Sequence, residues 1–260
     1  MKLTYEISEL VPYINWIYFY YAWQLRDAEA QQRQRKDAEA VLAELNGKYQ
    51  VYALFALLEA NADGDDIMAG GHRIPLLRQQ SGDCLCLSDF IRPSSSGVKD
   101  RIGVFATSVD HGLERDFDTD PYMKMMVQLL ADRLAEAAAE KMHESVRRTY
   151  WGYAPDEQLS IDELHAERFV GIRPAIGYPS LPDTSVNFVL DEMIDLKQIG
   201  IRLTESGAMK PHASVSGLMI SLPQAHYFSI GRIGHDQLAD YAKRRGLPVE
   251  VVRRFLSSNL

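Results

Sequence analysis

The feature that most constrains the fold is a long amphipathic segment that begins at Pro121 and reaches at least Arg148. Its apolar residues recur every three or four positions, which predicts a helix with one buried face. They are Met123, Val127, Leu130, Leu134, Ala138, Met142 and Val146. At a rise of about 1.5 Å per residue the helix is about 40 Å long, comparable with the diameter of a chain of 260 residues. The other elements must therefore be arranged along it.

One face of this predicted helix carries acidic residues four positions apart, which are Asp132, Glu136, Glu140 and Glu144. Like charges at that spacing repel by about 0.2–0.5 kcal/mol per pair. Neighbouring basic residues partly offset the repulsion. We interpret the set as a solvated face of the helix.

The remaining elements are grouped rather than strictly alternating. Helices are predicted over 27–45, 161–169, 188–198, 235–245 and 249–256, and strands over 51–58, 74–77, 84–87, 102–109, 213–222 and 227–230. This grouping predicts an α+β fold with a mostly antiparallel sheet. No break in the sequence marks a domain boundary, so residues 1–260 are expected to form a single domain, with the helical part at about 1–50 packed on it.

Charge and hydropathy exclude two classes of partner. With 28 Lys and Arg against 36 Asp and Glu, the net charge is −8, whereas nucleic-acid binders cluster cations. The most apolar run, 11–25, is shorter than the ~20 residues of a membrane span and is interrupted by Asn15 and Gln24. No signal peptide precedes it. We therefore expect a cytoplasmic protein that binds neither nucleic acid nor membrane.

The two cysteines, Cys84 and Cys86, lie one residue apart. On a strand they would point to the same face, and we interpret them as small buried thiols. No second cysteine pair or histidine cluster accompanies them, so no metal site is predicted. Phosphate loops, dinucleotide fingerprints, nucleophile elbows and His-Glu-x-x-His motifs are also absent from the sequence.

The segment over 171–183 is punctuated by glycine and proline. Pro174 and Pro179 stiffen the backbone, and Gly177 permits a close approach. Arg173 and Tyr178 offer a carboxylate clamp and an aromatic face, which suits a small zwitterionic ligand with a planar ring. The alternative is an ordinary loop whose arginine pairs with a helix carboxylate.

Short motifs in a fixed order run along nearly the whole chain. They are Tyr13-Ile-Asn-Trp16, Asp65-Asp66-Ile67, Leu77-Arg-Gln-Gln80, Ser88-Asp-Phe90, Ala131-Asp-Arg-Leu-Ala-Glu136, Tyr150-Trp-Gly-Tyr-Ala-Pro155, Gly171-Ile-Arg-Pro-Ala-Ile-Gly-Tyr-Pro179, Leu203-Thr-Glu-Ser206, Ala213-Ser-Val-Ser-Gly217 and 236–241. Each is weak alone, but the ordered set is specific. In these motifs the chain resembles the S-adenosylmethionine-binding activation domain of cobalamin-dependent methionine synthase.

The resemblance implies a C-shaped α+β domain with a central antiparallel sheet and flanking helices. It also implies a role in methionine biosynthesis, as a reactivation component of a vitamin B12 methyltransferase. In that family a flavodoxin-like donor reduces inactive cob(II)alamin, and S-adenosylmethionine bound by the domain methylates the product. The domain has no nucleophile of its own; it positions the methyl group.

Several site residues follow from the resemblance alone. It implies that Arg173 binds the methionine moiety, while Ala175 and Gly177 give backbone contacts and Tyr227 contacts the ligand from a later segment. Tyr178 would face the corrin ring of a docked cobalamin domain. Glu136 would lie near the amino group of the ligand, which separates it from the solvated acidic face.

Two positions depart from the family pattern. Asn15 stands where the family usually has Asp, so the position keeps an acceptor oxygen and loses a charge. Because charge-assisted hydrogen bonds are roughly twice as strong as neutral ones, we expect weaker ligand binding. Phe228 replaces a frequent Tyr beside Tyr227, with little expected consequence.

The chain starts at Met1 just before the matching pattern and contains no cobalamin-binding motif. The chain is therefore either an excised part of a larger synthase or a separate protein, and the initiator Met favours a separate protein. Its partner would then be a cobalamin-binding methionine synthase lacking its own activation domain. Two alternatives stay open. The protein could reactivate another corrinoid methyltransferase, or it could have lost ligand binding and act only as a docking subunit.

Overall fold

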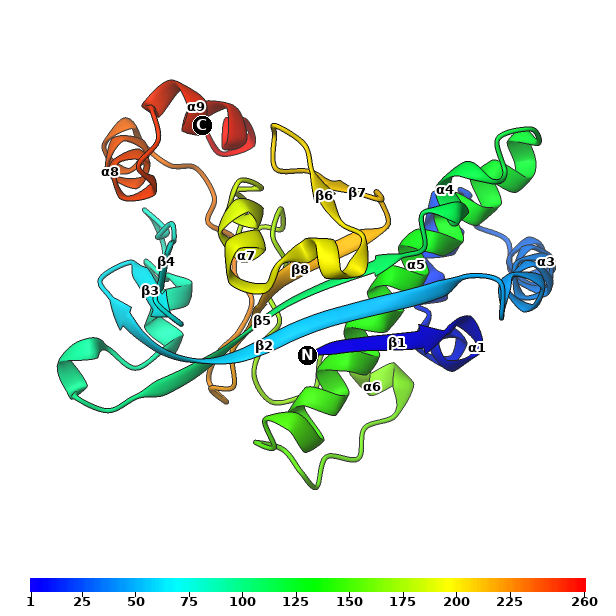
Figure 1. Ribbon diagram of the computed structural model, residues 1–260, viewed down its shortest axis with the longest axis horizontal. Helices are drawn as coiled ribbons and strands as arrows, with labels where there is room; N and C mark the ends of the chain where they lie inside the picture. Colours follow the sequence, from blue (N-terminus) through cyan, green and yellow to red (C-terminus); the bar gives the residue numbers. More distant parts are fainter.

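The computed structural model describes residues 1–260 and is built around a six-stranded antiparallel sheet (Figure 1). Its strands are β1 (Lys2–Glu6), β2 (Gln50–Asp63), β3 (Asp66–Ala69), β4 (His72–Pro75), β5 (Asp100–Val109) and β8 (Ser214–Met219). They lie in the order β4-β3-β2-β5-β8, with β1 added to β2. A separate two-stranded ribbon consists of β6 (Arg202–Leu203) and β7 (Met209–Lys210). The predicted α+β class with a mostly antiparallel sheet is confirmed.

The long strand β2 organises the sheet because it pairs along both of its edges. Leu54 lies between Lys2 of β1 and Ala106 of β5. Further along, Asn61 pairs with β3, so β1 and β3 share one edge of β2 in succession. The sequence predicts a turn at 61–66, but the strand continues to Asp63 and the chain turns at Gly64, whose φ is +59°.

Both faces of the sheet are covered, which explains why β2 reads as a continuous apolar run. Successive side chains of a strand point to opposite faces. Phe55 and Phe105 therefore lie in one buried cluster, and Leu54 and Val104 lie in a second cluster on the other face. Helices cover each cluster. Figure 1 shows β2 and β5 as curved neighbouring strands with helices on both sides of them.

The helices include five near the N-terminus and the middle of the chain, α1 (Ile7–Leu10), α2 (Trp16–Ala22), α3 (Ala28–Leu45), α4 (Gly112–Arg115) and α5 (Pro121–Ser145). Four follow: α6 (Ile161–His165), α7 (Val186–Ile194), α8 (His235–Arg245) and α9 (Val249–Phe255). None of them is long and apolar enough to span a bilayer.

The long helix α5 starts where the sequence indicates. Asp120 accepts hydrogen bonds from the backbone N–H groups of Tyr122 and Met123, and Pro121 occupies the first turn, where its missing N–H is no loss. The α-helix ends at Ser145, and the predicted continuation is a π-helical turn over Val146–Tyr150.

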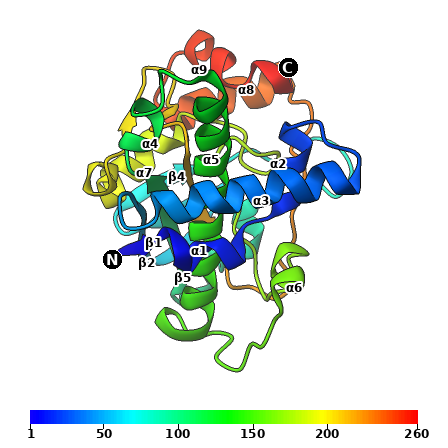
Figure 2. The ribbon, with the colours of Figure 1, turned by 90° about the vertical axis from the view of Figure 1, so that its right-hand side faces the viewer.

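The N-terminal helices pack against α5 on the first cluster. Figure 2 shows α3 crossing α5, with α1 and α2 beside it. Ile7, Phe19 and Leu42 are fully buried there with Leu130 and Leu134 of α5. Asp27 begins α3 by accepting a hydrogen bond from the N–H of Ala30 at 2.8 Å.

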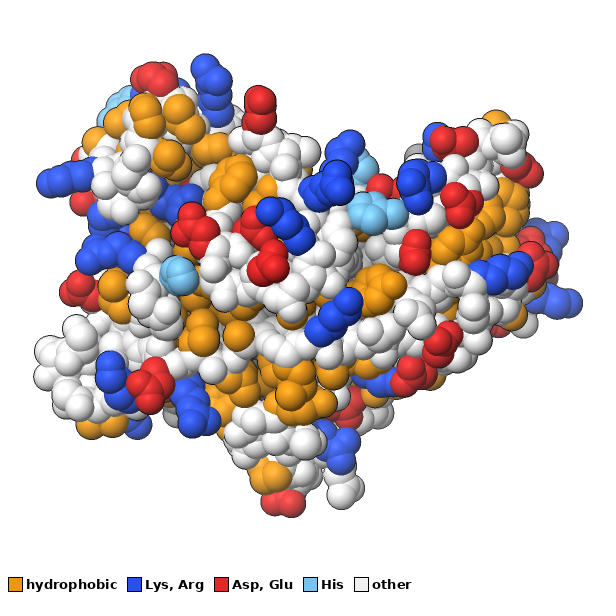
Figure 3. All heavy atoms as spheres, viewed as in Figure 1, with side chains coloured by type: hydrophobic (Ala, Val, Ile, Leu, Met, Phe, Trp, Pro, Cys, Tyr) orange, Lys and Arg blue, Asp and Glu red, His pale blue; other side chains and the backbone are white.

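The C-terminal helices α8 and α9 share a smaller cluster that contains Leu238 and Val252. Acidic and basic side chains are intermingled on the face of the molecule shown in Figure 3. Arg244 of α8 links these helices to the sheet, since its guanidinium pairs with Asp240 at 2.7 Å and also with the buried Asp66 of β3.

Three short strand and helix predictions are wrong. Cys84 has a φ of +54° and is exposed while Cys86 is buried, so the two thiols do not share a strand face. The backbone at 227–230 forms no strand, although it follows β8 closely in sequence. The helix predicted over 161–169 ends at His165.

Candidate functional site

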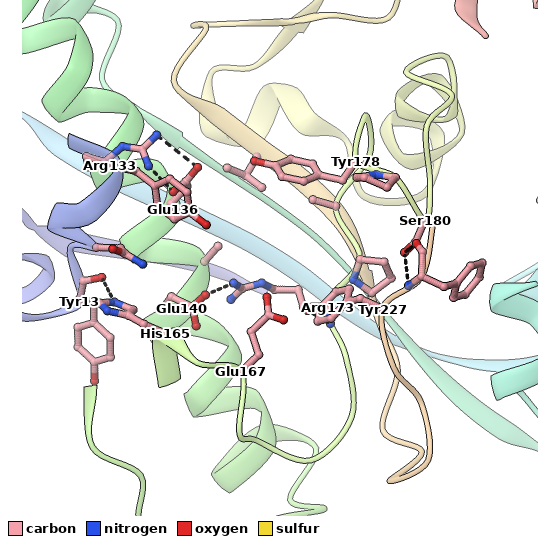
Figure 4. Close-up of a pocket in the computed structure, with 18 residues that line it drawn as sticks. Tyr13, Arg133, Glu136, Glu140, His165, Glu167, Arg173, Tyr178, Ser180 and Tyr227 are labelled. Carbon is pink, nitrogen blue, oxygen red and sulfur yellow. Dashed lines mark hydrogen bonds and ion pairs between the residues drawn. The ribbon is translucent and has the colours of Figure 1, made fainter. Parts of the chain in front are cut away.

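A cavity of about 720 Å³ lies between α5 and the glycine- and proline-rich segment (Figure 4). Its size is within the range of small-molecule sites. Its lining consists of Tyr13, Asn15, Tyr18, Arg133, Glu136, Ala139, Glu140, His165, Glu167, Arg173, Pro174, Ala175, Tyr178, Pro179, Ser180, Val215, Tyr227 and Phe228.

The structure brings together most of the residues that the sequence singles out. Six of them line this cavity: Asn15, Glu136, Arg173, Ala175, Tyr178 and Tyr227. Gly177 does not line it and instead shapes the turn that carries Tyr178. The six come from α5, the region before α2, the segment after α6 and the segment after β8, so only the tertiary fold unites them.

The segment over 172–176 is held against the outer edge of β8. The N–H of Leu218 donates to the carbonyl of Pro174 at 3.0 Å, and the N–H of Ile176 donates to the carbonyl of Ser216 at 2.9 Å. The close approach requires glycine at 217, because a Cβ there would clash with the backbone oxygen of Pro174. The floor of the cavity is therefore fixed by main-chain hydrogen bonds.

Gly177 turns the chain at the end of this segment. Its φ is +88°, a left-handed conformation that glycine adopts without strain. Its N–H donates to the carbonyl of Leu181 at 2.8 Å, and the N–H of Leu181 donates to the carbonyl of Tyr178 at 2.9 Å. The turn places Tyr178 at the rim of the cavity, where 54% of the residue is exposed.

Arg173 forms an ion pair with Glu140 inside the cavity, and Figure 4 shows the two side chains facing each other. The side chains are only 13% and 17% exposed. Burial is the largest single effect and would lower the pKa of Arg173, but Glu140, Tyr227 and Glu167 together outweigh it and the pKa is raised. The interpretation of the acidic set as a solvated face is wrong, because all four residues are at least half-buried.

Tyr227 lies beside Arg173 and contacts its backbone. Its hydroxyl oxygen accepts a hydrogen bond from the backbone N–H of Arg173 at 2.9 Å. Burial raises the pKa of Tyr227 to about 12, so the phenol stays protonated. Its own hydroxyl hydrogen is then available to a ligand.

Glu136 lies one turn before Glu140 on α5 and is held by Arg133. The two oxygens of Glu136 accept from the Arg133 guanidinium at 2.8 and 3.4 Å. Burial raises the pKa of Glu136, and the neighbouring Asp132 and Glu140 raise it further. Arg133 in turn lies over the ring of Tyr18, 5.6 Å from its centroid.

Asn15 has a structural role as well as a place in the cavity wall. Its side-chain oxygen accepts from the N–H of Ile17 at 3.2 Å and so caps α2. This cap fixes the first turn of α2, from which Tyr18 reaches the cavity.

A buried polar group behind the cavity was not predicted. Arg147 is fully buried and pairs through its Nε with both oxygens of Glu157, at 2.9 and 3.0 Å. His143 is also fully buried, and its ring packs edge-on against Phe169. Burial, helped by the charges of Arg173 and Arg147, holds the pKa of His143 well below its usual range.

The arrangement is suited to binding a charged ligand. Three carboxylates and two guanidinium groups line the cavity. The hydroxyl of Ser180 donates to the carbonyl of Phe228, and a ring nitrogen of His165 contacts the carbonyl of Tyr13 at 3.0 Å. These groups therefore do not form a nucleophile and base pair with each other.

Comparisons with known proteins agree with this geometry. Residues 6–246 match the family described as vitamin B12 dependent methionine synthase, activation domain. The chain is also similar to a crystal structure of the MetH reactivation domain bound to AdoHcy. The TM-score is 0.95 and the sequence identity 38%, and the match covers 100% of this chain and 90% of that one.

Proposed function

Because the chain belongs to the family of vitamin B12-dependent methionine synthase activation domains, we propose that it binds S-adenosylmethionine in the cavity beside α5. The observation that carries the proposal is the mixed charge of the cavity wall. A carboxylate, an ammonium and a sulfonium group on the ligand meet guanidinium and carboxylate groups on the protein. The AdoHcy bound by the similar MetH domain supports a ligand of this class.

Each proposed contact residue matches one chemical group of the ligand. Arg173 is the cation for the ligand carboxylate, and the hydroxyl of Tyr227 is the neighbouring donor. The backbone of Ala175 lies in the cavity wall. Glu136 and Asn15 complete the polar wall, the first with a negative charge that favours a cationic ligand.

We further propose that the rim of the cavity docks on the cobalamin domain of methionine synthase. The exposed ring of Tyr178 is the group that would face the corrin. S-adenosylmethionine supplies the methyl group that restores methylcobalamin after a flavodoxin-like donor has reduced the inactive cofactor. The chain itself contributes binding and orientation, which bring the sulfonium methyl into line with the metal.

The first experiment is a calorimetric titration with S-adenosylmethionine. We expect saturable binding by the wild type and about a hundredfold loss with Arg173→Ala, since a buried charge-assisted contact is removed. Arg168→Ala is the matched control, because this arginine is 68% exposed and lies outside the cavity; its affinity should equal that of the wild type. Wild-type protein that takes up no ligand would refute the proposed binding function.

A second assay tests the role in reactivation. The protein is added to inactive cobalamin-loaded methionine synthase without this domain, together with an electron donor and S-adenosylmethionine. The absorbance of methylcobalamin should appear with the wild type and not with Arg173→Ala. Binding without methylation of this partner would instead favour another corrinoid protein.

A further inference from the structure

The turn that carries Tyr178 lies beyond the bonds that fix the cavity segment to β8. Those main-chain bonds end at Ile176. In Figure 4 the ring of Tyr178 extends from the turn toward Glu136 of α5. Because more than half of Tyr178 is exposed, contacts of its own ring do little to fix it. The position of the ring therefore depends on what holds residues 179–183.

Asp183, at the end of the turn, is held by two side chains of α8. The hydroxyl of Tyr241 donates to Asp183 Oδ2 at 2.8 Å, and Nε of Arg245 lies 3.7 Å from the same oxygen. Tyr241 and Arg245 are four positions apart, so they project from one face of the helix. Asp183 Oδ1 accepts from the N–H of Ser185 at 2.8 Å. Both oxygens of this buried carboxylate thus have partners, as a buried charge requires.

Tyr241 is suited to hold a carboxylate in place. The residue is 1% exposed and packs with Leu238 and Val252 in the cluster of α8 and α9. Burial, with the negative charge of Asp183, holds the pKa of Tyr241 well above its usual range, so the phenol remains a donor. Loss of the hydroxyl would leave part of a buried carboxylate unpaired, which is costly.

The segment that leads into α8 also holds the turn. The N–H of Ile230 donates to the carbonyl of Pro179 at 2.9 Å. The hydroxyl of Ser180 donates to the carbonyl of Phe228, and the N–H of Phe228 donates back to Ser180 Oγ at 3.2 Å. The chain over 228–245 therefore holds the turn from behind, although no residue of α8 lines the cavity.

We propose that Tyr241, through Asp183, positions the turn so that the ring of Tyr178 faces the docked cobalamin domain. Arg245 completes this group of three residues, which we call the α8 anchor. The inference rests on the proposed docking function and gives α8 a part in it. A turn that is already ordered loses less conformational entropy when a partner binds. Arg173 lies in the segment bound to β8, so ligand binding and docking depend on different supports.

The first experiment compares docking with ligand binding in Tyr241→Phe, which removes the hydroxyl and keeps the ring. Docking is measured as the protein concentration that gives half-maximal methylcobalamin formation on inactive cobalamin-loaded synthase without this domain, at saturating S-adenosylmethionine. Calorimetry gives the affinity for S-adenosylmethionine. We expect the half-maximal concentration to rise about tenfold and the ligand affinity to change by less than about twofold.

Two further variants separate positioning from general packing. Val252→Ala is the matched control, because Val252 is fully buried in the same cluster and has no hydrogen-bonding side chain. It loosens the packing of α8 but should leave docking and ligand affinity unchanged. In the Tyr178→Ala background, Tyr241→Phe should add nothing, because the ring that the anchor positions is absent.

Hydrogen exchange tests the α8 anchor without a partner or a ligand. Exchange at the N–H groups of Gly177 and Leu181 reports opening of the turn, since these groups close it. Tyr241→Phe should speed their exchange about tenfold, whereas Val252→Ala should not. The N–H of Ile176, which is bonded to β8, should exchange at the same rate in all the proteins.

Three results would overturn the inference. Unchanged docking or unchanged exchange in Tyr241→Phe would show that α8 does not position the turn. Equal losses of docking and ligand affinity would show that α8 supports the whole cavity. A loss that adds fully to that of Tyr178→Ala would show that α8 acts through another residue. Wild-type protein that forms no methylcobalamin would instead refute the proposed docking function, and exchange would separately decide whether the α8 anchor holds the turn.

Discussion

The hydroxyl of Tyr227 accepts a hydrogen bond from the backbone N–H of Arg173 at 2.9 Å, across 54 positions of the chain. Tyr227→Phe removes this acceptor and leaves the N–H unpaired. We expect unfolding to become easier by about 1–2 kcal/mol and ligand affinity to fall about fivefold. Urea unfolding and calorimetry measure the two effects. Tyr21→Phe, at a residue that is 83% exposed, is the control, and equal behaviour of the two variants would contradict the role given to Tyr227.

Asn15→Asp should tighten ligand binding. The change keeps the oxygen that caps α2 and adds a negative charge to the wall of a cavity proposed to bind a cation. It also places that charge at a helix N-terminus, where it is favourable by about 0.3–1 kcal/mol. Calorimetry should show an increase of about threefold to tenfold in affinity. An affinity that stays the same or falls would show that this position does not sense the ligand charge.

His143 should make stability fall as the pH falls. In the folded protein its pKa is held well below 6.5 by burial and by Arg173 and Arg147, so it stays neutral. The unfolded chain binds a proton below about pH 6.5, and unfolding is then favoured by up to about 1.4 kcal/mol per pH unit. His143→Gln should flatten this slope between pH 6.5 and 5, as measured by urea unfolding. His235→Gln, at an exposed site, should leave the slope unchanged; equal slopes in all three proteins would contradict the assignment.

Gly217→Ala should destabilise the protein by about 3 kcal/mol or more, because the added Cβ meets backbone of the cavity segment rather than a movable side chain. Gly103→Ala is the matched control in the neighbouring strand. Its Cβ meets the Cβ and the terminal methyl of Met219, and the methyl can move away whereas backbone cannot, so we expect a smaller loss. Thermal unfolding compares the two variants, and similar values would show that the segment can move away from β8.

Local signals predicted the long helices well. Asp27 and Pro121 mark the starts of α3 and α5 in the sequence, and the structure adds Asp120 as the cap of α5. The strand ends were predicted less well. The segment over 227–230 has an alternating pattern typical of a strand, but it finds no partner strand, and pairing is a property of the tertiary fold.

The candidate site was likewise predicted only in part from the sequence. The sequence indicated Arg173 and Tyr178 through their unusual surroundings, and both line the cavity. Glu140 was grouped with a solvated face because a four-residue spacing does not tell which way that face points. The spacing still held a usable signal, since Glu136, already assigned to the ligand, lies on the same face one turn away. The choice between a ligand clamp and an arginine paired with a helix carboxylate was not exclusive, because Arg173 is paired with Glu140 and faces the cavity.

The main-chain bonds between the segment over 172–176 and β8 also bear on how the protein avoids self-association. β8 is the last strand in the sheet order, and its outer edge would otherwise offer free N–H and carbonyl groups to another chain. The segment covers that edge, and the N–H of Arg173, which points away from β8, donates to the hydroxyl of Tyr227 and is therefore not free to pair with another strand. The residues that form the cavity floor thus also prevent another chain from pairing with β8. Substitutions that displace this segment should therefore lower solubility as well as ligand affinity.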